Sequence, residues 1–554
     1  MSSAQAPVYE AIAAELTRQG IGDMFGVLGH GNMRVVNAWC QRSGRFHLAR
    51  HEANAMLMAD SYARVSGRVG ACTVTQGPGL GNAFSSLVTA RRARSPVLML
   101  AGQIETGPQA IDQDSIFAAA GVPVAPLSAG SAREDIAAAF RLSQRERTPV
   151  GINMPMPLLE RPTCMDEPSL ATPLSAPAPV DAAGVGHAVE LIRNARRPVV
   201  LAGRGAVWAH AADQISALAQ EIGALLVTTY LAKGFFHGDP WEIGISGGFS
   251  SALARELLAS ADCLIAFGAS FDPLTLDGGE LYDPATSVVR CDVAPDALEP
   301  ASPCYAPLCA DARVAATALL EGLRRGPRPG FGWRDPALRR RLDAWDPVAE
   351  LDPADPGSGL DPRRVVLAIE HVLPRDRVLV AAGGHCQGWP AMYMSVPDAR
   401  SLVSPFEFGA VGGGLGAAVG AAVARPDVLT VCVLGDGDLL MGLADLDSAV
   451  RFGTRLLVIV LNDGAYGSEV NAMRDLGIDP SLARYVTPDF AALARACGGD
   501  GMTIGRLEDV NELGRRASAL DGLLVADCRI SGEVRAEWDQ RLQVRTLRAL
   551  ASAA

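Results

Sequence analysis

The sequence lacks the features that mark several protein classes. Its 11 cysteines include no CxxC pair, so it offers neither a zinc knuckle nor a redox dithiol, and their odd number argues against a fully paired disulfide framework. The 49 basic side chains are outnumbered by 61 acidic ones, and the net charge of −12 disfavours a phosphate-backbone partner. No apolar run reaches the ~18 residues that span a bilayer, and the N-terminus lacks a basic segment followed by an apolar one. We expect a cytoplasmic protein in a reducing setting that binds neither nucleic acid nor a membrane.

Chain length and proline distribution predict three domains. At ~100–200 residues per domain, a chain of 554 residues holds about three. Proline-dense stretches with weak hydrophobic periodicity, at residues 161–180 and 326–362, are typical of linkers, and the second is interrupted by a helix-like segment at 337–345. The predicted domains cover residues 1–165, 182–325 and 360–535.

Short apolar runs rich in Val, Leu and Ile alternate with helical stretches in all three blocks. These runs lie at residues 96–102, 198–203, 263–270, 287–293 and 455–461. Nearly continuous hydrophobic strands between helices are typical of parallel sheets covered on both faces. The expected fold class is α/β, with three doubly wound parallel-sheet domains. Ligands of such sheets bind at the carboxyl ends of the strands.

Two acidic, glycine-rich turns each follow a predicted strand. The sequence GDGD begins at Gly435, directly after the apolar run 429–434, and NDG begins at Asn462, after the run 455–461. The segment between them predicts a helix whose apolar face carries Leu440, Leu443, Leu446 and Ala449. Each turn alone is an ordinary strand-end turn in most proteins. Together, at one edge of a sheet, they offer carboxylate and carbonyl oxygens to a divalent cation that also holds phosphate oxygens.

This pair of turns resembles the diphosphate-binding signature of thiamine diphosphate enzymes. The resemblance implies a Mg²⁺ ion held by Asp436, Asp463 and the carbonyl of Ala465. The family usually has two asparagines in the second turn, so either Asp463 or, with a shifted register, Asn462 is the ligand. The implied cofactor contacts from the two turns are Gly435, Asp436, Gly437, Asp438, Asp463, Ala465, Tyr466 and Gly467.

A second resemblance lies in "RHEANAMLMADSYARVSGRVGACTVTQGPGLGNA", residues 50–83. It is similar to the pyrimidine-binding domain of the same superfamily, in the branch that contains acetolactate synthase and benzoylformate decarboxylase. The catalytic glutamate of the family corresponds to Glu52, and Pro78 and Asn82 are implied cofactor contacts. A glutamate in a first helical turn also complements the helix dipole, which is the alternative for Glu52 alone.

Two glycine-rich stretches resemble further parts of the cofactor site. "GHCQGWPA", residues 384–391, implies His385 and Gln387 near the phosphates. "SPFEFGAVGGGLGAAVGAA", residues 404–422, implies the backbone of Gly409 at the aminopyrimidine and Val411 as an apolar wedge that bends the cofactor. A glycine-rich helix start is itself a common packing device, so these assignments depend on the resemblance.

The middle block, with "LAGRGAVW" and "IGALLVTTYLAKGFFHGDP", resembles the central domain of acetolactate synthases. Some relatives bind FAD there and others keep the domain without it. The GRG at residues 203–205 is a weak motif, so a domain without FAD is favoured over a flavin site. No GxGxxG follows a strand with the acidic residue that a NAD-dependent dehydrogenase needs.

The resemblance covers roughly residues 5–535 and implies a thiamine diphosphate- and Mg²⁺-dependent 2-oxo acid decarboxylase or carboligase. Such enzymes act through a C2 ylid and a carbanion or enamine intermediate on the cofactor. Their active sites lie between subunits, which implies a homo-oligomer, a dimer or a dimer of dimers. The implied substrate is a small 2-oxo acid or a related carbonyl compound.

Three residues are candidates for the substrate side of the site. His30 lies in a loop after the first strand, Gln113 matches a glutamine that projects toward the cofactor in relatives, and Glu469 matches a proton-handling glutamate. A lone loop histidine is as often structural as functional. The segment GSEVNAM lacks the Gly-Met-Val run of acetolactate synthases, which puts acetolactate formation in doubt. A true acetolactate synthase and a noncatalytic cofactor-binding protein stay open as alternatives.

Overall fold

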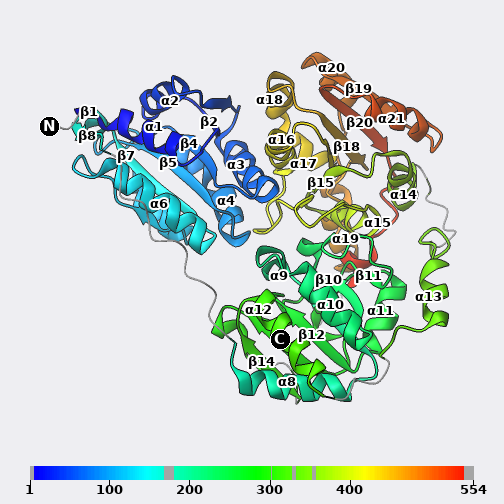
Figure 1. Cartoon of the computed structure of the whole chain (residues 1–554). Helices are drawn as coiled ribbons and strands as arrows, with labels where there is room; N and C mark the ends of the chain where they lie inside the picture. The colour runs from blue at the N-terminus through cyan, green and yellow to red at the C-terminus, as the bar shows by residue number, and fades with distance from the viewer. Residues whose placement is uncertain are drawn as a thin grey trace. The chain divides into compact units, whose positions relative to one another are not determined.

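Strand-forming and helix-forming stretches alternate along the chain and build three six-stranded parallel sheets with helices on their faces (Figure 1). The computed structural model describes residues 5–166, 180–300, 302, 304–326, 332–351, 357 and 359–541. The predicted α/β class with three doubly wound sheets is confirmed. Most of the linker expected at 161–180 lies outside the described residues, as do residues 327–331, 352–356 and 358 of the second one.

The described residues form two compact units rather than three. The first comprises residues 5–166, 372–387 and 403–532, and it contains two of the sheets. The second comprises the described residues between 180 and 371 together with 388–402 and 533–541, and it contains the third sheet. The three domain boundaries drawn from the sequence stay a prediction.

The N-terminal sheet of the first unit has the strand order β3-β2-β4-β5-β7-β6. Its strands are β2 (Asp23–Gly26), β3 (Arg45–Leu48), β4 (Gly70–Val74), β5 (Val97–Gln103), β6 (Val124–Ala125) and β7 (Pro149–Pro155). Its helices are α1 (Val8–Arg18), α2 (Met33–Cys40), α3 (Glu52–Ser66), α4 (Pro78–Arg92), α5 (Gln113–Ala119), α6 (Ala132–Glu146) and α7 (Met156–Leu159). A short antiparallel pair, β1 (Gln5–Pro7) and β8 (Pro162–Cys164), lies beside it.

The second sheet of this unit has the order β16-β15-β17-β18-β20-β19 and so repeats the topology of the first. Its strands are β15 (Arg377–Ala381), β16 (Leu402–Val403, whose first residue belongs to the second unit), β17 (Leu429–Gly435), β18 (Leu456–Asn462), β19 (Asp500–Ile504) and β20 (Leu523–Arg529). The helical segments are η4 (His385–Gln387), α16 (Gly414–Ala424), α17 (Asp436–Gly442), η5 (Leu443–Asp445), α18 (Leu446–Arg451), α19 (Gly467–Asp475), η6 (Pro480–Ala483), α20 (Phe490–Ala496) and α21 (Asp509–Ser518).

The shared strand order places a topological switch point in each sheet of this unit. The chain winds in opposite directions from β2 and β4 in one sheet and from β15 and β17 in the other. Ligands of doubly wound sheets bind outside the strand ends at such points. The loops that follow these four strands are therefore the expected ligand-binding loops.

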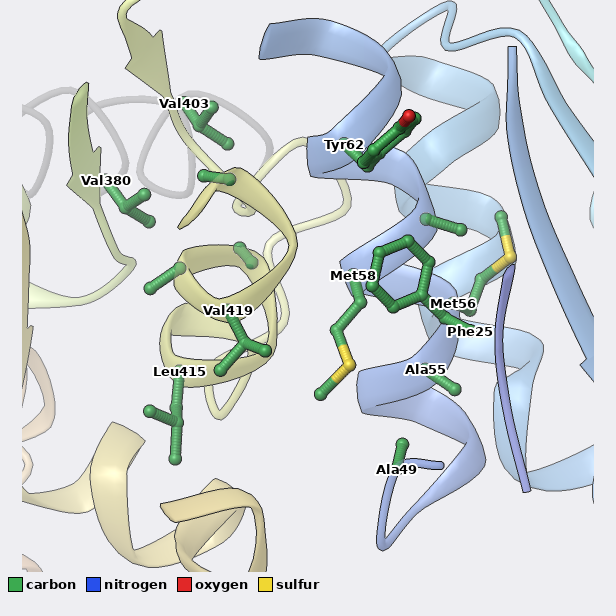
Figure 2. Close-up of a cluster of buried hydrophobic side chains, with 14 of the residues drawn as sticks. Phe25, Ala49, Ala55, Met56, Met58, Tyr62, Val380, Val403, Leu415 and Val419 are labelled. Atoms are coloured by element: carbon green, nitrogen blue, oxygen red, sulfur yellow. The ribbon is translucent and has the colours of Figure 1, made fainter. Parts of the chain in front are cut away.

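Helices α3 and α16 hold equivalent positions in the two sheets and pack against each other. Figure 2 shows Met58 of α3 pointing toward Leu415 and Val419 of α16, all within one buried cluster. Two glycines of α16 permit the close approach: a Cβ at Gly420 would lie 2.1 Å from the carbonyl oxygen of Met58, and one at Gly416 would lie 2.9 Å from Asn54 Oδ1. Gly420 is required by packing because its contact is with backbone, and a Cβ at Gly416 would also lie 3.1 Å from the Asn54 Cα.

The prediction of a single helix between GDG and the next strand is wrong in one respect, because this segment is divided into α17, η5 and α18. Leu446 and Ala449 are buried as expected. Asp445 lies at the end of η5, and its buried carboxylate accepts hydrogen bonds from the Arg50 backbone amide at 3.0 Å and the Asn54 side chain at 2.6 Å. These bonds tie the end of η5 to the start of α3.

The second unit contains the sheet β11-β10-β9-β12-β13-β14, the strand order of dinucleotide-binding folds. Its strands are β9 (Pro198–Ala202), β10 (Leu225–Thr228), β11 (Glu242–Ile245), β12 (Cys263–Phe267), β13 (Ser287–Asp292) and β14 (Tyr305–Cys309). Its α-helices are α8 (Ala182–Asn194), α9 (Arg204–Trp208), α10 (Ala212–Ile222), α11 (Ala252–Ala259), α12 (Ala312–Arg324), α13 (Pro336–Asp343), α14 (Pro362–Val372, whose last residue belongs to the first unit) and α15 (Gly388–Tyr393). Three 3-10 turns complete it: η1 (Tyr230–Ala232), η2 (Asp277–Gly279) and η3 (Pro295–Ala297).

The only lysine of the chain, Lys233, lies in this second unit. Its ammonium donates a hydrogen bond to the carbonyl oxygen of Ala391 in α15, and its charge acts on the nearby Glu242. All 11 cysteines are free thiols. No helix among the described residues combines the length and the apolarity needed to cross a bilayer.

Candidate functional site

The GDG turn lies at the junction of β17 and α17, beside the switch point of the second sheet. Gly435 ends the strand and Asp436 begins the helix, so no residue lies between the two elements. Asp436 is 1% exposed, and its carboxylate accepts hydrogen bonds from the amide of Gly464 at 2.7 Å, from the amide of Gly437 at 2.6 Å and from the hydroxyl of Tyr485 at 2.8 Å. Burial raises the pKa of Asp436, and these hydrogen bonds oppose the rise.

The NDG turn follows β18 and lies next to the GDG turn. Burial, and after it the charge of the Asp436 carboxylate, raises the pKa of Asp463 to about 7. Asn462 has a different surrounding: its amide donates to Asp527 Oδ1 at 2.8 Å, and its oxygen accepts from the Thr487 hydroxyl at 3.2 Å. The Asp463 carboxyl is therefore the one coupled to Asp436, while the Asn462 side chain is bound within another network.

His385 approaches the NDG turn from the loop after β15. A Cβ at Gly467, the first residue of α19, would lie 3.0 Å from His385 Nδ1 and 3.1 Å from Asp463 Oδ2. A glycine at position 467 therefore leaves room for the imidazole beside the carboxyl group. The structure thus brings three predicted site residues, His385, Asp463 and Gly467, into one cluster with Asp436.

Ala465 and Tyr466 lie between these elements. Ala465 forms an isolated bridge with Arg484, and the Tyr466 ring packs edge-on against Tyr485 with ring centroids 5.2 Å apart. Gly437 is also required here, because a Cβ on it would lie 2.6 Å from the Tyr466 ring and 2.8 Å from the Tyr485 hydroxyl. Tyr485 is not among the residues predicted from the sequence, because it lies in an irregular segment between η6 and α20 and belongs to no motif.

Asp438 has a role that its place in the GDGD motif did not indicate. It is 2% exposed, and it accepts hydrogen bonds from the amides of Gly412 at 2.9 Å and Gly414 at 3.0 Å. These amides belong to the end of residues 404–413, named the wedge loop here, and to the first residue of α16. Burial raises the pKa of Asp438 to about 6, against the effect of the two amides.

The wedge loop carries two predicted contact residues, Gly409 and Val411. Gly409 has φ +84°, a left-handed conformation that favours glycine, and Val411 is 37% exposed. Gln387, another predicted contact, is buried and donates a 2.9 Å hydrogen bond to the hydroxyl of Ser404 at the start of the same loop. The loops after β15, β16, β17 and β18 are thus connected to one another.

Glu52 lies at the corresponding edge of the N-terminal sheet. It is the first residue of α3, is half-buried, and its Oε2 accepts a 3.0 Å hydrogen bond from the side chain of Asn82 in α4. Pro78 begins α4 after Gly77, whose φ of +65° and whose contact with the Gln109 carbonyl oxygen leave no room for a side chain. Three predicted residues, Glu52, Pro78 and Asn82, are therefore grouped at the start of α3 and α4.

The three candidates for the substrate side are placed separately. His30 is exposed in the loop after β2, which the buried Asn32 holds through hydrogen bonds with the Gly29 amide at 2.9 Å and the Val27 carbonyl at 3.1 Å. Gln113 is 1% exposed and donates to Asn153 Oδ1 at 3.2 Å. Glu469 is exposed in the first turn of α19. No described hydrogen bond joins these three side chains.

The cluster at the GDG and NDG turns offers oxygen donors but not a complete metal site. Among the described residues, no group of three or more His, Cys, Asp and Glu side chains is arranged to hold a metal ion. Two carboxylates and one backbone carbonyl fall short of the about six oxygens that Mg²⁺ prefers. A cation here would thus need further oxygens from a ligand such as a diphosphate, and from water.

Family models of known proteins match most of the chain. Three family models match the chain in order: "Thiamine pyrophosphate enzyme, N-terminal TPP binding domain" at residues 7–120, the central domain of the same enzymes at 185–319, and their C-terminal TPP binding domain at 382–528. The first and last ranges contain Glu52 and the two acidic turns respectively.

Similar proteins align over most of the chain. An acetolactate synthase large subunit of Parasynechococcus marenigrum is 28% identical over an alignment of 519 residues, which covers 89% of this chain and 82% of the relative. A sulfoacetaldehyde acetyltransferase of Castellaniella defragrans is 25% identical over 540 residues, covering 92% and 90% of the two chains. An acetolactate synthase of Mycobacterium bovis is 27% identical over 537 residues, covering 92% and 86%.

Proposed function

We propose, from the premise that this chain belongs to the thiamine pyrophosphate enzyme family, that it cleaves or forms the C–C bond of a small 2-oxo acid or related carbonyl compound. The observation that carries the proposal is the pairing of two features. The GDG and NDG turns adjoin at one sheet edge, where Asp436 accepts a 2.7 Å hydrogen bond from the Gly464 amide, and Glu52 lies at the start of α3.

The residues of the two acidic turns fit a diphosphate held through Mg²⁺. Asp436, Asp463 and the Ala465 carbonyl would be the protein ligands, with His385, Gly437 and Gly467 around the phosphates. Asp463 is preferred to Asn462 because both polar ends of the Asn462 side chain are bonded to Thr487 and Asp527. When bound, thiamine diphosphate supplies a nucleophilic carbon and an electron sink for carbonyl chemistry.

Glu52 would hold a proton at the pyrimidine nitrogen of the cofactor. Its carboxyl group is fixed by the helix start and by the Asn82 side chain, so its distance from a bound ring is set by the fold. Val411 and the Gly409 backbone would bend the cofactor, and His30, Gln113 and Glu469 are the residues that we assign to the substrate side.

We infer that the active protein is a homo-oligomer in which a second copy completes the site. Large apolar side chains are exposed around both sheet edges that carry the predicted residues. They are Leu28 and Ile111 near the N-terminal edge and Phe408, Val411, Met441, Leu476, Ile478, Leu482 and Val486 near the other. A second copy of the chain is the occupant that would cover both edges at once, and would let Glu52 of one chain serve the turns of the other.

Two finer assignments remain proposals. A true acetolactate synthase is favoured by the names of several relatives and disfavoured by the sequence GSEVNAM in α19. The transferase class is favoured by the relative named sulfoacetaldehyde acetyltransferase. The domain ranges 1–165, 182–325 and 360–535, and a central domain without FAD, complete the proposal.

The decisive experiment combines purified protein, thiamine diphosphate and Mg²⁺ with a panel of 2-oxo acids, with and without acceptor aldehydes that include sulfoacetaldehyde. Release of CO₂ or formation of a C–C bond from one donor supports the proposal, and acetolactate from pyruvate alone identifies the synthase. Tight cofactor binding without hydrogen–deuterium exchange at C2 would instead support a noncatalytic cofactor-binding protein.

A further inference from the structure

Asp438 connects two loops of the proposed cofactor site. We propose that Asp438 is a positioning residue that fixes the wedge loop, residues 404–413, against the GDG turn and thereby sets the bend of the bound cofactor. The inference rests on the proposed function and deepens it. It gives Asp438 a part different from that of Asp436, although both belong to one GDGD sequence.

The two hydrogen bonds of Asp438 supply a helix cap from outside the helix. Gly413 is the N-cap residue of α16 and has no side chain to cap the buried amides of the first turn, which have no partner within the helix. The Asp438 carboxylate accepts from Gly412 and from Gly414, and its negative charge lies at the positive end of the α16 dipole. Bonds between a carboxylate and backbone amides are charge-assisted and stronger than neutral ones.

The first turn of α17 thus binds two other loops, the NDG turn and the wedge loop. Residues 436 and 438 are separated by two steps of about 100°, so their side chains point to nearly opposite sides of α17. Asp436 binds the amide of Gly464 in the NDG turn, and Asp438 binds the amides at the end of the wedge loop. Any displacement of the α17 start therefore moves the metal ligands and the wedge together.

The wedge loop depends on such a restraint. Gly409 and Gly412 both have positive φ, at +84° and +97°, and glycine loses the most conformational freedom when it is fixed. A Cβ at Gly412 would lie 2.7 Å from Met441 Cβ, so the loop also packs directly on α17. Without Asp438 we expect Val411 to shift while the GDG and NDG turns keep their own bonds.

Because the wedge loop can shift while the two acidic turns stay in place, we expect the loss of Asp438 to slow the reaction more than it weakens cofactor binding. We expect cofactor affinity to depend mainly on the contacts with the diphosphate. The reaction would depend on how closely the aminopyrimidine and thiazolium rings of the bound cofactor approach each other. A misplacement of about 1 Å at a reacting geometry costs on the order of 10²-fold in rate. Asp438→Asn keeps the shape but can accept only through one oxygen, so we expect C2 hydrogen–deuterium exchange and kcat to fall about 10- to 100-fold, with the Kd for thiamine diphosphate within a few-fold.

The experiment compares Asp438→Asn, Val411→Ala and their combination in the full-length protein with thiamine diphosphate and Mg²⁺. Asp509→Asn is the matched control, because Asp509 also accepts two backbone amides, from Gly505 at 3.0 Å and Arg506 at 2.9 Å, at the start of α21. Cofactor affinity is measured by calorimetry and C2 exchange by NMR. If Asp438 acts through Val411, the double variant should be no slower than the slower single variant.

Each outcome decides the inference. Wild-type exchange in Asp438→Asn overturns it, and so does an equal loss of affinity and exchange, which would mean that Asp438 acts on the diphosphate. Full additivity with Val411→Ala excludes the wedge as the route. If Asp438→Asn does not fold, Asp438→Glu, which keeps both oxygens but displaces them by one methylene, must show the same split. A wild-type protein that fails to bind the cofactor overturns the proposed function itself.

Discussion

The hydroxyl of Tyr485 donates a 2.8 Å hydrogen bond to Asp436 Oδ1, which joins the segment after η6 to the GDG turn. Tyr485 also packs against Tyr466, and its backbone amide binds the Gly464 carbonyl oxygen. It is thus attached to both acidic turns. Burial and the Asp436 carboxylate raise the pKa of the Tyr485 phenol, so it stays a hydrogen-bond donor at neutral pH.

Tyr485→Phe tests whether this contact orients a metal ligand. We expect Mg²⁺ affinity in the presence of thiamine diphosphate to fall about 10- to 100-fold, the usual cost of removing a partner that orients a ligand. Asp436→Ala should abolish the binding of Mg²⁺ and thiamine diphosphate. Calorimetric titration with Mg²⁺ is the measurement, and Tyr282→Phe, which removes a hydroxyl that bonds Ser246 in the second unit, is the control. Unchanged Mg²⁺ affinity in Asp436→Ala would remove the metal assignment.

Glu52→Gln separates a working enzyme from a protein that only binds the cofactor. The variant keeps the helix start and a contact with Asn82 but cannot move a proton, so folding and cofactor affinity should persist. Exchange at C2 should fall by ~10²–10⁴-fold, the usual contribution of a positioned acid or base. Glu10→Gln, a substitution at another first helical turn, should leave exchange unchanged. Equal rates in wild type and Glu52→Gln would contradict the assignment.

Gly420→Ala should destabilise the first unit. The added methyl group meets the Met58 backbone, which cannot move aside as a side chain can, and overpacking of this kind costs about 1–3 kcal/mol. The gain in helix propensity, about 0.5–1 kcal/mol, offsets only part of that cost. Gly186→Ala in α8 has open space around the new methyl group and should gain stability. If calorimetry shows no fall in Tm for Gly420→Ala, α3 and α16 do not pack as described.

The raised pKa of Glu242 predicts that the stability of the second unit depends on pH. Burial, partly opposed by Lys233, raises the pKa of Glu242 to about 7 from its ordinary 4.5. A carboxyl group with a raised pKa in the folded state binds its proton more tightly there than in the unfolded chain. Its contribution to stability is therefore fully present below about pH 4.5 and is lost as the pH rises through about 7.

Thermal unfolding between pH 4.5 and 8 tests this dependence. Glu242→Gln should flatten the decline in Tm over that range, because the titrating group is gone. Glu256→Gln is the control, since the Arg341 contact lowers the pKa of Glu256 and its contribution changes only at lower pH. The same decline in wild type and Glu242→Gln would assign the pH dependence to other groups.

The substrate-side assignments can be tested one residue at a time. His30→Ala should alter the product ratio or kcat with the true substrate, because His30 is exposed beside the N-terminal sheet edge. Gln113→Ala should also lower Tm, since Gln113 is buried and bonded to Asn153. Wild-type turnover and product ratios in both variants and in Glu469→Ala would refute this map of the substrate side.

The sequence by itself determined the fold class and the main parts of the candidate site. Apolar runs such as those that became β9, β12 and β18 were readable because strands buried on both faces need continuous hydrophobic sequence. Asp436 and Asp463 could be predicted as candidates because each lies in a turn that directly follows an apolar run, whereas Glu52 was predicted from the resemblance of residues 50–83 to the family. These signals all lie within short windows of the chain.

Tertiary structure alone decided the contacts between distant segments. Tyr485 and Asp438 acquire their roles from partners 49 and 24–26 residues away in sequence, and no periodicity encodes such a pairing. Asp445, at the end of η5, binds Asn54, 391 residues earlier, and no local pattern indicates that contact. The need for glycine at position 420 arises from Met58 in another sheet domain. Hydrophobic patterning sets which face of an element is buried, but the identity of its neighbour depends on how the two sheets pack.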